Sequence, residues 1–482
     1  MGEQRAELEK TMGTFDVLCM AFGTMIGWGW IMLAGSWVAD GGVAGAILAF
    51  VIGAVMCIFV GLTYAELTPA LPATGGGLVF AYRGLGYTGG WITGWSMIFA
   101  YVGVAAWEGP ALATAIQYIV PLPKIATLWT IEGFEVTGGF VLVGVIGGII
   151  ISGINFMGGH GAALFETIAT SALAIGGVLF FVSSMVKGDA ANAVPMLTTG
   201  KGIVAVIIQV PAMFVGFDVI PQTVEESNVP MSKLGNIIII AIIMAGVWYM
   251  MMILAISFAA PNDFRMQSLE SAVGVPVADA FAHCMGSEIL GKCIIVVALC
   301  GILTSWNGFI IGAARLMFAM GRAKMLPEVF GKTHPKFGSP YAAVLLVGIV
   351  TFLSPLLGKN ALSWFVDASS LGTVFAYLMV CISFIQVRKK EPNLDRPYKA
   401  PGTWVGYVAT IISLFFIYLY TPIGPGALSV PCWAMVAFWI VLGVILYQMA
   451  KNTHKNVKAS ERELLIFGAD IARKDYLEGK YD

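Results

Sequence analysis

Several long stretches of this chain contain no aspartate, glutamate, lysine or arginine, and this feature limits the fold more than any other. Six of them are residues 17–39, 41–65, 84–107, 136–165, 234–262 and 400–450. Each is at least as long as the ~20 residues that cross a bilayer core as a helix, and the last is long enough to cross twice. Only 11% of the residues are charged, less than half of the ~25% in an average soluble domain. The chain is therefore predicted to be an all-α integral membrane protein rather than a soluble enzyme.

Charges, prolines and glycine-rich turns divide the chain into twelve predicted spans. These spans are about 14–37, 42–66, 86–119, 137–155, 162–186, 203–224, 234–259, 290–320, 339–357, 361–387, 404–422 and 430–450. Residues 1–13 precede this membrane domain of residues 14–450, and residues 451–482 follow it. The latter mix charges with a short apolar turn, which predicts an amphipathic helix that lies against the bundle or the headgroups. No second soluble domain is predicted.

The placement of basic residues predicts the orientation of the chain. With the N-terminus in the cytoplasm, one basic residue, Arg315, lies inside a span, and only six of the 27 lysines and arginines lie on the outer side. The six are Lys124, Lys187, Lys201, Arg265, Lys292 and Lys359. Cytoplasmic loops carry the excess of basic residues, so both termini are predicted to be cytoplasmic. The first span is expected to serve as its own insertion signal, and the absence of N-x-[ST] sites is compatible with a bacterial inner membrane.

Glycines and prolines interrupt two of the predicted spans near their centres. The first span has three glycines within seven residues, Gly23, Gly27 and Gly29, and the sixth has Pro211 and Pro221 around a Gly-Phe-Asp core. Broken helices are tolerated in hydrocarbon where they are buried in protein or line a cavity. Their freed amides attract an anionic group and their freed carbonyls attract a cation. Two such breaks at corresponding positions indicate the mid-membrane site of a transporter, with close helix packing as the alternative.

Five ionisable groups lie within or at the edge of the spans: Glu108, Glu166, Asp218, Arg315 and Asp367. A charge at mid-bilayer costs at least ~2.5 kcal/mol, so each is expected to face the interior of the bundle. Asp218 lies on the sixth-span break, where it is predicted to couple protonation to gating or else to cap a half-helix. Glu108 is predicted to attract a cation or to pair with a neighbour. Structural ion pairs are expected for Glu166 and Arg315, and Asp367 has no assigned role.

Two bulky rings, Trp28 and Trp30, flank a glycine at the first break. An indole at this place narrows the pocket and offers its face to an ammonium group, an interaction worth ~0.5–2 kcal/mol. The alternative is that both rings anchor or pack the helix. The seven cysteines and four histidines are scattered along the chain, so neither a disulfide framework nor a metal centre is predicted.

Five segments of the chain together resemble the motifs of the amino acid/polyamine/organocation permease superfamily. Residues 23–31 are similar to its first-span signature, roughly G-x-I-I-G-x-G-I-F. The other similar segments are 64–67 with 72 and 74–76 (Y-x-E-L, then P-x-x-G-G), 214–218 with 225–230 (G-F-[DE], then E-E-x-x-N-P), 307–315 with 321–327 (ending in G-x-L-P), and 396–401 (R-P-[FY]-K-x-P). These motifs follow the family's order over most of the chain.

The resemblance implies a LeuT-like fold, in which two five-span repeats are inverted and spans 1 and 6 are discontinuous. The repeats would cover about 14–186 and 203–387, with two extra spans in 404–450. The implied function is secondary transport of a small amino acid or organic amine by alternating access, so the chain is not expected to be an enzyme.

The resemblance also implies a substrate site at the two breaks. The amides near Gly27, Trp28 and Gly29 would hold a carboxylate, and the carbonyls of Ile26, Phe214, Val215 and Gly216 would hold an amine. Phe217 or Phe214 would then close over the ligand. Asp218 matches a carboxylate position that is proposed to sense protons in some members.

Two departures from the family pattern bear on mechanism. Span 5 lacks the lysine that many proton-linked members place against the first break, and Leu173 is near the expected position. Thr304 and Ser305 would instead supply hydroxyls to a sodium site with the Gly23 and Ile26 carbonyls, unless these hydroxyls bond to their own helix. The second departure is Trp28, where amino acid carriers usually have a small residue. It favours a short-chain amino acid, or an amine that lacks the carboxylate.

Other classes of protein are weighed against this interpretation. A sensor that has lost transport would keep the same binding site, whereas a channel is expected to show repeated pore motifs or rings of like charge. No cofactor is predicted apart from a coupling sodium ion or proton. The expected partners are the substrate and membrane lipid, without nucleic acid, and the sequence predicts no oligomeric state.

Overall fold

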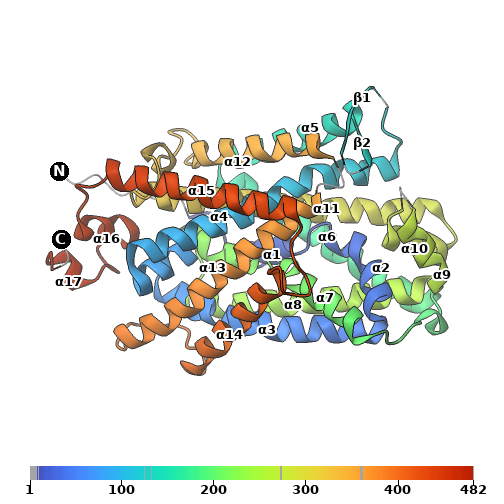
Figure 1. The fold of residues 1–482 in the computed structure, drawn as a ribbon, viewed down its shortest axis with the longest axis horizontal. Helices are drawn as coiled ribbons and strands as arrows, with labels where there is room; N and C mark the ends of the chain where they lie inside the picture. Colours follow the sequence, from blue (N-terminus) through green and yellow to red (C-terminus); the bar gives the residue numbers. More distant parts are fainter. Residues whose placement is uncertain are drawn as a thin grey trace.

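The structure is a computed structural model that describes residues 8, 10–123, 125–131, 133–271, 274–358 and 362–480. Long helices run side by side along one direction of the molecule (Figure 1). The helices α16 and α17 lie at one end, and β1, β2, α9 and α10 lie at the other. We call these the tail end and the hairpin end.

The first half of the chain contains two helices that share one break, four further helices and a β-hairpin. Its elements are α1 (Thr14–Met25), α2 (Gly29–Gly41), α3 (Val43–Ala70), α4 (Gly77–Ile119), β1 (Thr127–Ile131), β2 (Phe134–Thr137), α5 (Gly138–Phe156) and α6 (Gly159–Lys187). The axes of α1 and α2 differ by 49°. The interruption predicted for the first span is therefore present in the structure.

The second half begins with a second interrupted helix and ends with the tail. Its α-helices are α7 (Gly200–Met213), α8 (Met231–Ala259), α9 (Asn262–Glu270), α10 (Pro276–Met285), α11 (Glu288–Arg322), α12 (Tyr341–Leu353), α13 (Leu362–Lys390), α14 (Trp404–Tyr420), α15 (Val430–Thr453), α16 (Ala459–Phe467) and α17 (Lys474–Leu477). Short 3-10 turns are η1 (Ala190–Asn192), η2 (Phe217–Gln222), η3 (Val224–Glu226), η4 (Glu328–Gly331) and η5 (Ser354–Leu357).

Within the described residues, nine helices are long and apolar enough to cross a membrane, and the bent pair α1–α2 makes a tenth span. Two shorter apolar segments, Tyr341–Leu357 and Trp404–Tyr420, complete the set. Each of the twelve predicted ranges overlaps one of these helices or helix pairs. The number of crossings and the inverted repeat remain predictions, because helix length and composition alone do not fix them.

The structure adds one short β-hairpin to the predicted all-α membrane fold. The segment before α5 forms an antiparallel hairpin, in which Thr130 of β1 is opposite Glu135 of β2. Its strands are rich in threonine and in aromatic and β-branched residues, which favour strands, and Gly133 takes a φ of 74° at the turn. The Trp129 indole Nε1 donates to the Leu356 carbonyl at 2.8 Å, which ties the hairpin to the end of η5.

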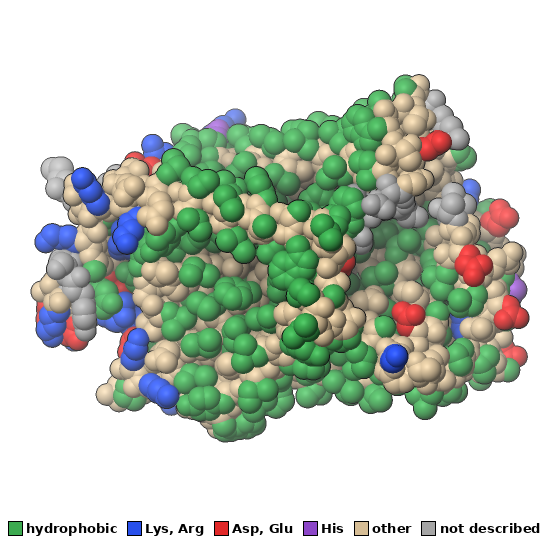
Figure 2. Space-filling model, in the orientation of Figure 1, with side chains coloured by type: hydrophobic (Ala, Val, Ile, Leu, Met, Phe, Trp, Pro, Cys, Tyr) green, Lys and Arg blue, Asp and Glu red, His purple; other side chains and the backbone are tan. Residues whose placement is uncertain are grey.

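Charged side chains hold the tail end together. Arg83 on α4 donates to Glu391 after α13 at 2.6 Å and to Glu463 on α16 at 2.9 Å. The tail thus lies against the bundle, as its composition predicts. In Figure 2 the Lys and Arg side chains gather at the tail end, and hydrophobic side chains cover much of the middle. This distribution is the one expected if the tail end faces the cytoplasm.

Candidate functional site

The two interrupted helices meet at their breaks. Gly216, between α7 and η2, takes a φ of 141°, a conformation that favours glycine. A Cβ atom at this position would lie 2.8 Å from the Met25 backbone nitrogen at the end of α1. The close approach therefore requires glycine, and it brings the unwound backbone of residues 26–28 beside that of residues 214–216.

A small cavity of about 50 Å³ lies at this junction. Its walls come from the two breaks and from α4, α8, α11 and α13. They are formed by Thr24, Met25, Gly27, Trp28, Gly29, Val104, Trp107, Glu108, Ala212, Met213, Val215, Tyr249, Ser305, Phe309, Val366, Ser369, Ser370 and Thr373. The cavity has room for only a few water molecules. Side chains in its wall must therefore move before a larger molecule can enter.

Glu108 supplies the carboxyl group of the cavity. Its side chain is buried, and one carboxylate oxygen accepts a hydrogen bond from the Ser305 hydroxyl. The other oxygen, Oε2, is buried without a hydrogen-bond partner among the described residues. A Cβ atom at Gly27 would lie 3.2 Å from Oε1, which places this carboxylate directly against the first break. Glu108 was predicted to attract a cation or to pair with a neighbour. The unpartnered Oε2 atom favours the first alternative.

The tryptophans at the first break have different surroundings. Trp28 lines the cavity, whereas Trp30 is fully buried and packs edge-on against Trp248 with ring centroids 5.6 Å apart. The structure thus supports a pocket position for Trp28 and a packing role for Trp30. No side chain among the described residues caps the start of α2 at Trp28, so this helix start presents backbone amides beside the cavity, of which that of Ile31 bonds to the Trp28 carbonyl at 3.3 Å.

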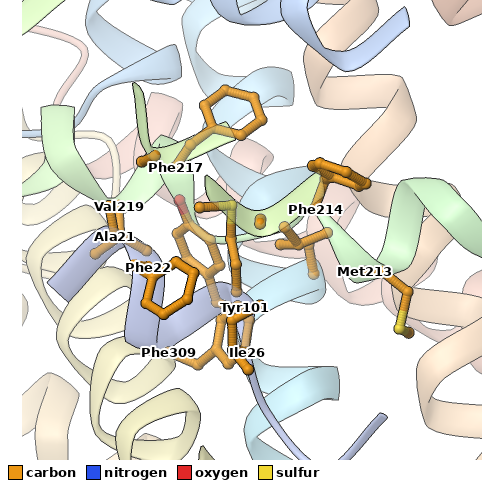
Figure 3. Packing of buried hydrophobic residues seen from close by; sticks show 14 of the residues in the cluster. Ala21, Phe22, Ile26, Tyr101, Met213, Phe214, Phe217, Val219 and Phe309 are labelled. Carbon is orange, nitrogen blue, oxygen red and sulfur yellow. The ribbon is translucent and has the colours of Figure 1, made fainter. Parts of the chain in front are cut away.

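Several residues predicted at the site do not line the cavity. Figure 3 shows two of them, Phe214 and Phe217, among other buried hydrophobic side chains. Phe214 packs against Tyr249, and Phe217 packs against Tyr64, with ring centroids 6.1 Å and 5.5 Å apart. Ile26 is fully buried. Gly27, Trp28, Gly29 and Val215 are the members of the predicted substrate set in the wall. Contact of any of them with a substrate remains a prediction.

Asp218 is buried beside the second break and its carboxylate is well supplied with donors. Its Oδ1 accepts from the Gly216 amide at 2.8 Å and from the Tyr377 hydroxyl at 3.2 Å. Its Oδ2 accepts from the Tyr101 hydroxyl at 2.6 Å. Asp218 lies in the first turn of η2, and its bond to the Gly216 amide is compatible with the structural alternative for this residue. Coupling of Asp218 protonation to gating remains a prediction.

The residues predicted to bind sodium point to two different places. Thr304 donates to the Gly23 carbonyl at 3.1 Å, as a shared site requires. The Ser305 hydroxyl, however, lies within hydrogen-bond distance of Glu108 and of the Ile302 carbonyl on its own helix, and its one proton is donated to either of them. The sodium site remains a prediction.

The carbonyls at the first break face α11. A Cβ atom at Gly301 would lie 2.7 Å from the Ile26 oxygen and 3.2 Å from the Gly27 oxygen. The Leu173 side chain reaches the same place, 3.5 Å from that position. Leu173 thus lies near the first break, where the spacing argument placed it.

Gly301→Ala should abolish transport, because a methyl group there collides with backbone that cannot rotate away. The expected result is loss of uptake together with a lowered midpoint of thermal unfolding. Overpacking of this kind typically costs about 1–3 kcal/mol. Gly153→Ala is the matched control, because nothing lies within 4 Å of a Cβ atom on that helical glycine. Uptake as in the wild type for Gly301→Ala would contradict the close packing.

The other ionisable groups within the spans differ in their surroundings. Arg315 forms the expected ion pair, donating from Nε to Glu226 at 2.9 Å. Asp367 is exposed on α13. Glu166 is fully buried but accepts from the neutral Asn307 amide at 2.6 Å, and no ion pair joins it to a described residue. The ion pair expected for Glu166 is therefore wrong, because its neighbours on α11 are uncharged.

Tyr249, Trp107 and Met213 are among the parts of the cavity wall that were not predicted from the sequence. Tyr249 on α8 donates its hydroxyl to the Met25 carbonyl at 2.8 Å and so satisfies one of the freed carbonyls. The Trp107 Nε1 atom is buried without a partner, and the Met213 sulfur lies beside Gly29. A tyrosine in an otherwise charge-free span was a signal that identifies Tyr249, since a buried hydroxyl needs a partner. Nothing in the sequence distinguishes Met213 from packing methionines.

The chain is similar to known amino acid permeases and transporters over most of its length. The family model described as amino acid permease matches residues 16–462. The chain is 26% identical over 463 residues to the branched-chain amino acid permease BcaP of Bacillus subtilis, covering 93% of this chain and 95% of that protein. It is 25% identical over 472 residues to the methylthioribose transporter of the same organism, covering 93% and 94%. It is also 25% identical over 407 residues to human cationic amino acid transporter 4, covering 82% and 62%.

Proposed function

Because the chain belongs to the amino acid permease family, we propose that it is a secondary transporter for a small amino acid or a small organic amine. The substrate would bind at the junction of the two breaks and reach each side of the membrane by alternating access. The single observation that carries this proposal is that Glu108 Oε2 is buried at the cavity between the breaks without a hydrogen-bond partner among the described residues.

The polar groups of the cavity match the two ends of an amino acid. The uncapped start of α2 carries the positive end of a helix dipole, which attracts a carboxylate. Glu108 attracts an ammonium group, and the Trp28 ring adds a face on which a cation is stabilised. An amine without a carboxylate would use the Glu108 half alone. The relatives named above carry different solutes, so the family does not fix the substrate.

Alternating access fits the way the cavity is closed. Towards the tail end, Arg315 and Arg322 of α11 pair with Glu226 and Glu225, which follow the second break. The backbone of Glu226 also accepts from the Thr11 amide at 2.9 Å. In our proposal the tail end faces the cytoplasm of a cell membrane, and these pairs separate when the site opens to that side.

Trp28→Ser should broaden the ligand range towards larger amino acids, because the indole occupies part of a wall around a very small cavity. The measurement is competition of unlabelled amino acids against radiolabelled serine uptake. Trp404→Ser, which removes a ring that is 53% exposed, is the control and should leave the profile unchanged. A Trp28→Ser profile identical to that of the wild type would place the ring outside the pocket.

Uptake by the purified protein in liposomes tests the proposed function. A transporter accumulates or exchanges the substrate with a saturable rate, whereas a sensor binds it without moving it. A channel would equilibrate the substrate without saturation and without stimulation by substrate loaded on the opposite side. Binding without uptake would overturn the proposal in favour of a sensor.

A further inference from the structure

A second buried carboxylate, Glu166, lies away from the cavity and has no role in the proposed substrate site. It belongs to α6 and faces α1 and α11. The side chain is fully buried, and no lysine, arginine or histidine among the described residues pairs with it. An ionised carboxylate in such surroundings is costly unless hydrogen bonds or a cation compensate it.

The hydrogen bonds around Glu166 do not supply enough donors for the ionised form. Asn307 donates from Nδ2 to Oε2 at 2.6 Å. Among the described residues, the other hydrogen-bonding neighbour of Glu166 is the Thr170 hydroxyl, 3.5 Å from Oε1, and this hydroxyl also lies 3.2 Å from the Cys19 carbonyl. A hydroxyl has one proton, so it satisfies either the carbonyl or Oε1. When Thr170 donates to Cys19, Oε1 has no donor.

A proton on Glu166 resolves this shortage. The protonated Oε1 donates to the Thr170 oxygen, Thr170 donates to the Cys19 carbonyl, and Asn307 continues to donate to Oε2. The two Glu166 oxygens, the Thr170 hydroxyl and the Cys19 carbonyl then each have a partner. The orientation of Asn307 is fixed, because its Oδ1 accepts from Asn155 at 2.8 Å and its Nδ2 also lies 3.3 Å from the Ala162 carbonyl.

A metal cation does not fit the same place. The Asn307 amide presents a donor to the carboxylate, whereas a metal ion needs oxygen ligands on all sides. The Thr170 hydroxyl and Glu166 Oε1 also lie so close to the Gly23 backbone that a Cβ atom on Gly23 would overlap both. The geometry therefore favours a proton over sodium.

No positively charged group among the described residues lies near enough to compensate an ionised Glu166. The titratable groups that face Glu166 from α1 are Cys19 and Asp16, and neither carries a positive charge. From α5 and α11 the neighbours are the amides Asn155 and Asn307. The helices α8 and α10 pack against the other half of α6, through Trp248 at Gly177 and Phe281 at Phe180.

We propose that Glu166 is a proton-binding site and that its protonation holds α1 against α6 and α11. The inference rests on the proposed transport function. Because Gly23 and Cys19 belong to α1, the neutral acid completes the contact between α1 and α6. Loss of the proton leaves a buried charge that water must solvate, so the ionised form favours separation of α1 from α6. Binding and release of one proton thereby accompany the change of access.

Glu166→Gln is the direct test, because the glutamine amide donates to Thr170 and accepts from Asn307 as the neutral acid does. In liposomes with radiolabelled leucine, serine and lysine, the variant should keep exchange against internal substrate. It should lose accumulation driven by a pH gradient, so that internal substrate never exceeds external substrate. Exchange should also become independent of pH. Wild-type accumulation in Glu166→Gln, or sodium-dependent accumulation that this variant abolishes, would overturn the proton site.

Two further measurements separate this result from a general defect. Asp16→Asn changes another acid at the interface of α1 and α6, where Thr167 donates to it at 2.8 Å, and should retain pH-driven accumulation. Infrared difference spectra of the wild type should show a protonated carboxyl band at neutral pH that is missing in Glu166→Gln. This spectroscopic test does not depend on transport. Absence of such a band from the wild type would contradict the inference even if the variant fails to fold, and exchange by Glu166→Gln would still support the proposed transport function.

Discussion

Glu108→Gln should raise the half-saturating substrate concentration by roughly 10- to 100-fold, while the protein remains folded. Hydrogen bonds to a charged group contribute about 1.5–3 kcal/mol, and about 1.4 kcal/mol is a factor of ten in affinity. The glutamine keeps an acceptor for Ser305 but has no charge for the ammonium group. Initial uptake rates at increasing substrate concentration measure the effect.

The control for this change is Glu135→Gln, which removes an exposed carboxylate in the hairpin and should leave the half-saturating concentration unchanged. A comparison of substrates sharpens the test. Amines without a carboxylate should lose more affinity than zwitterions, because Glu108 is their main charged contact. Equal half-saturating concentrations for the wild type and Glu108→Gln would show that the unpartnered Oε2 atom does not contact the substrate.

Glu226→Gln should lower the free energy of unfolding by about 3–5 kcal/mol, because it leaves Arg315 buried without a counter-charge. Both side chains are almost fully buried, with 2% of Arg315 and 5% of Glu226 exposed. The guanidinium currently forms two hydrogen bonds to this carboxylate, at 2.9 Å and 3.1 Å. Denaturant or thermal unfolding of the protein in detergent measures the loss.

Glu328→Gln provides the comparison for the buried pair. Glu328 pairs with Lys324 at 3.0 Å, but its side chain is 52% exposed. Lys324 lowers the pKa of the Glu328 carboxyl below its usual value, first through a hydrogen bond and then through its charge. Exposed pairs contribute at most about 1 kcal/mol, so this variant should unfold close to the wild type. Equal losses for both variants would contradict the difference in burial.

The sequence predicts the membrane architecture well because hydrocarbon imposes strict limits. Charge-free stretches must become helices, and the interruptions at Gly27 and Gly216 are visible as clusters of glycine and proline. The hairpin was missed because short strands in a loop have no such signature. Thr127 to Thr137 contains strand-forming residues, but eleven residues between two spans also suit an irregular loop.

The candidate site is predicted less completely, since it depends on which side chains converge from distant helices. The break residues and Glu108 lie at the cavity, whereas Ile26 and Phe217 pack elsewhere. Ser305 follows Thr304 in sequence, yet the helical turn of about 100° per residue directs the two hydroxyls to different neighbours. The uncharged surroundings of Glu166 come from Asn155 and Asn307, which are far apart in sequence, so no local pattern predicts them.

Binding of matched ligands to the purified protein tests the central claim most directly. Ligand binding to the folded state raises its stability by about 2.7 kcal/mol at 100 times the dissociation constant. Leucine, serine and lysine, their decarboxylated amines, and the hydroxy acids that lack the amine would each be added to wild type and Glu108→Gln. We expect at least one ammonium-bearing ligand to raise the unfolding midpoint of the wild type. The same ligand should raise the midpoint of Glu108→Gln much less. No hydroxy acid should raise the midpoint of either protein. Stabilisation by hydroxy acids equal to that by the amino acids, or unchanged stabilisation of Glu108→Gln, would contradict this expectation.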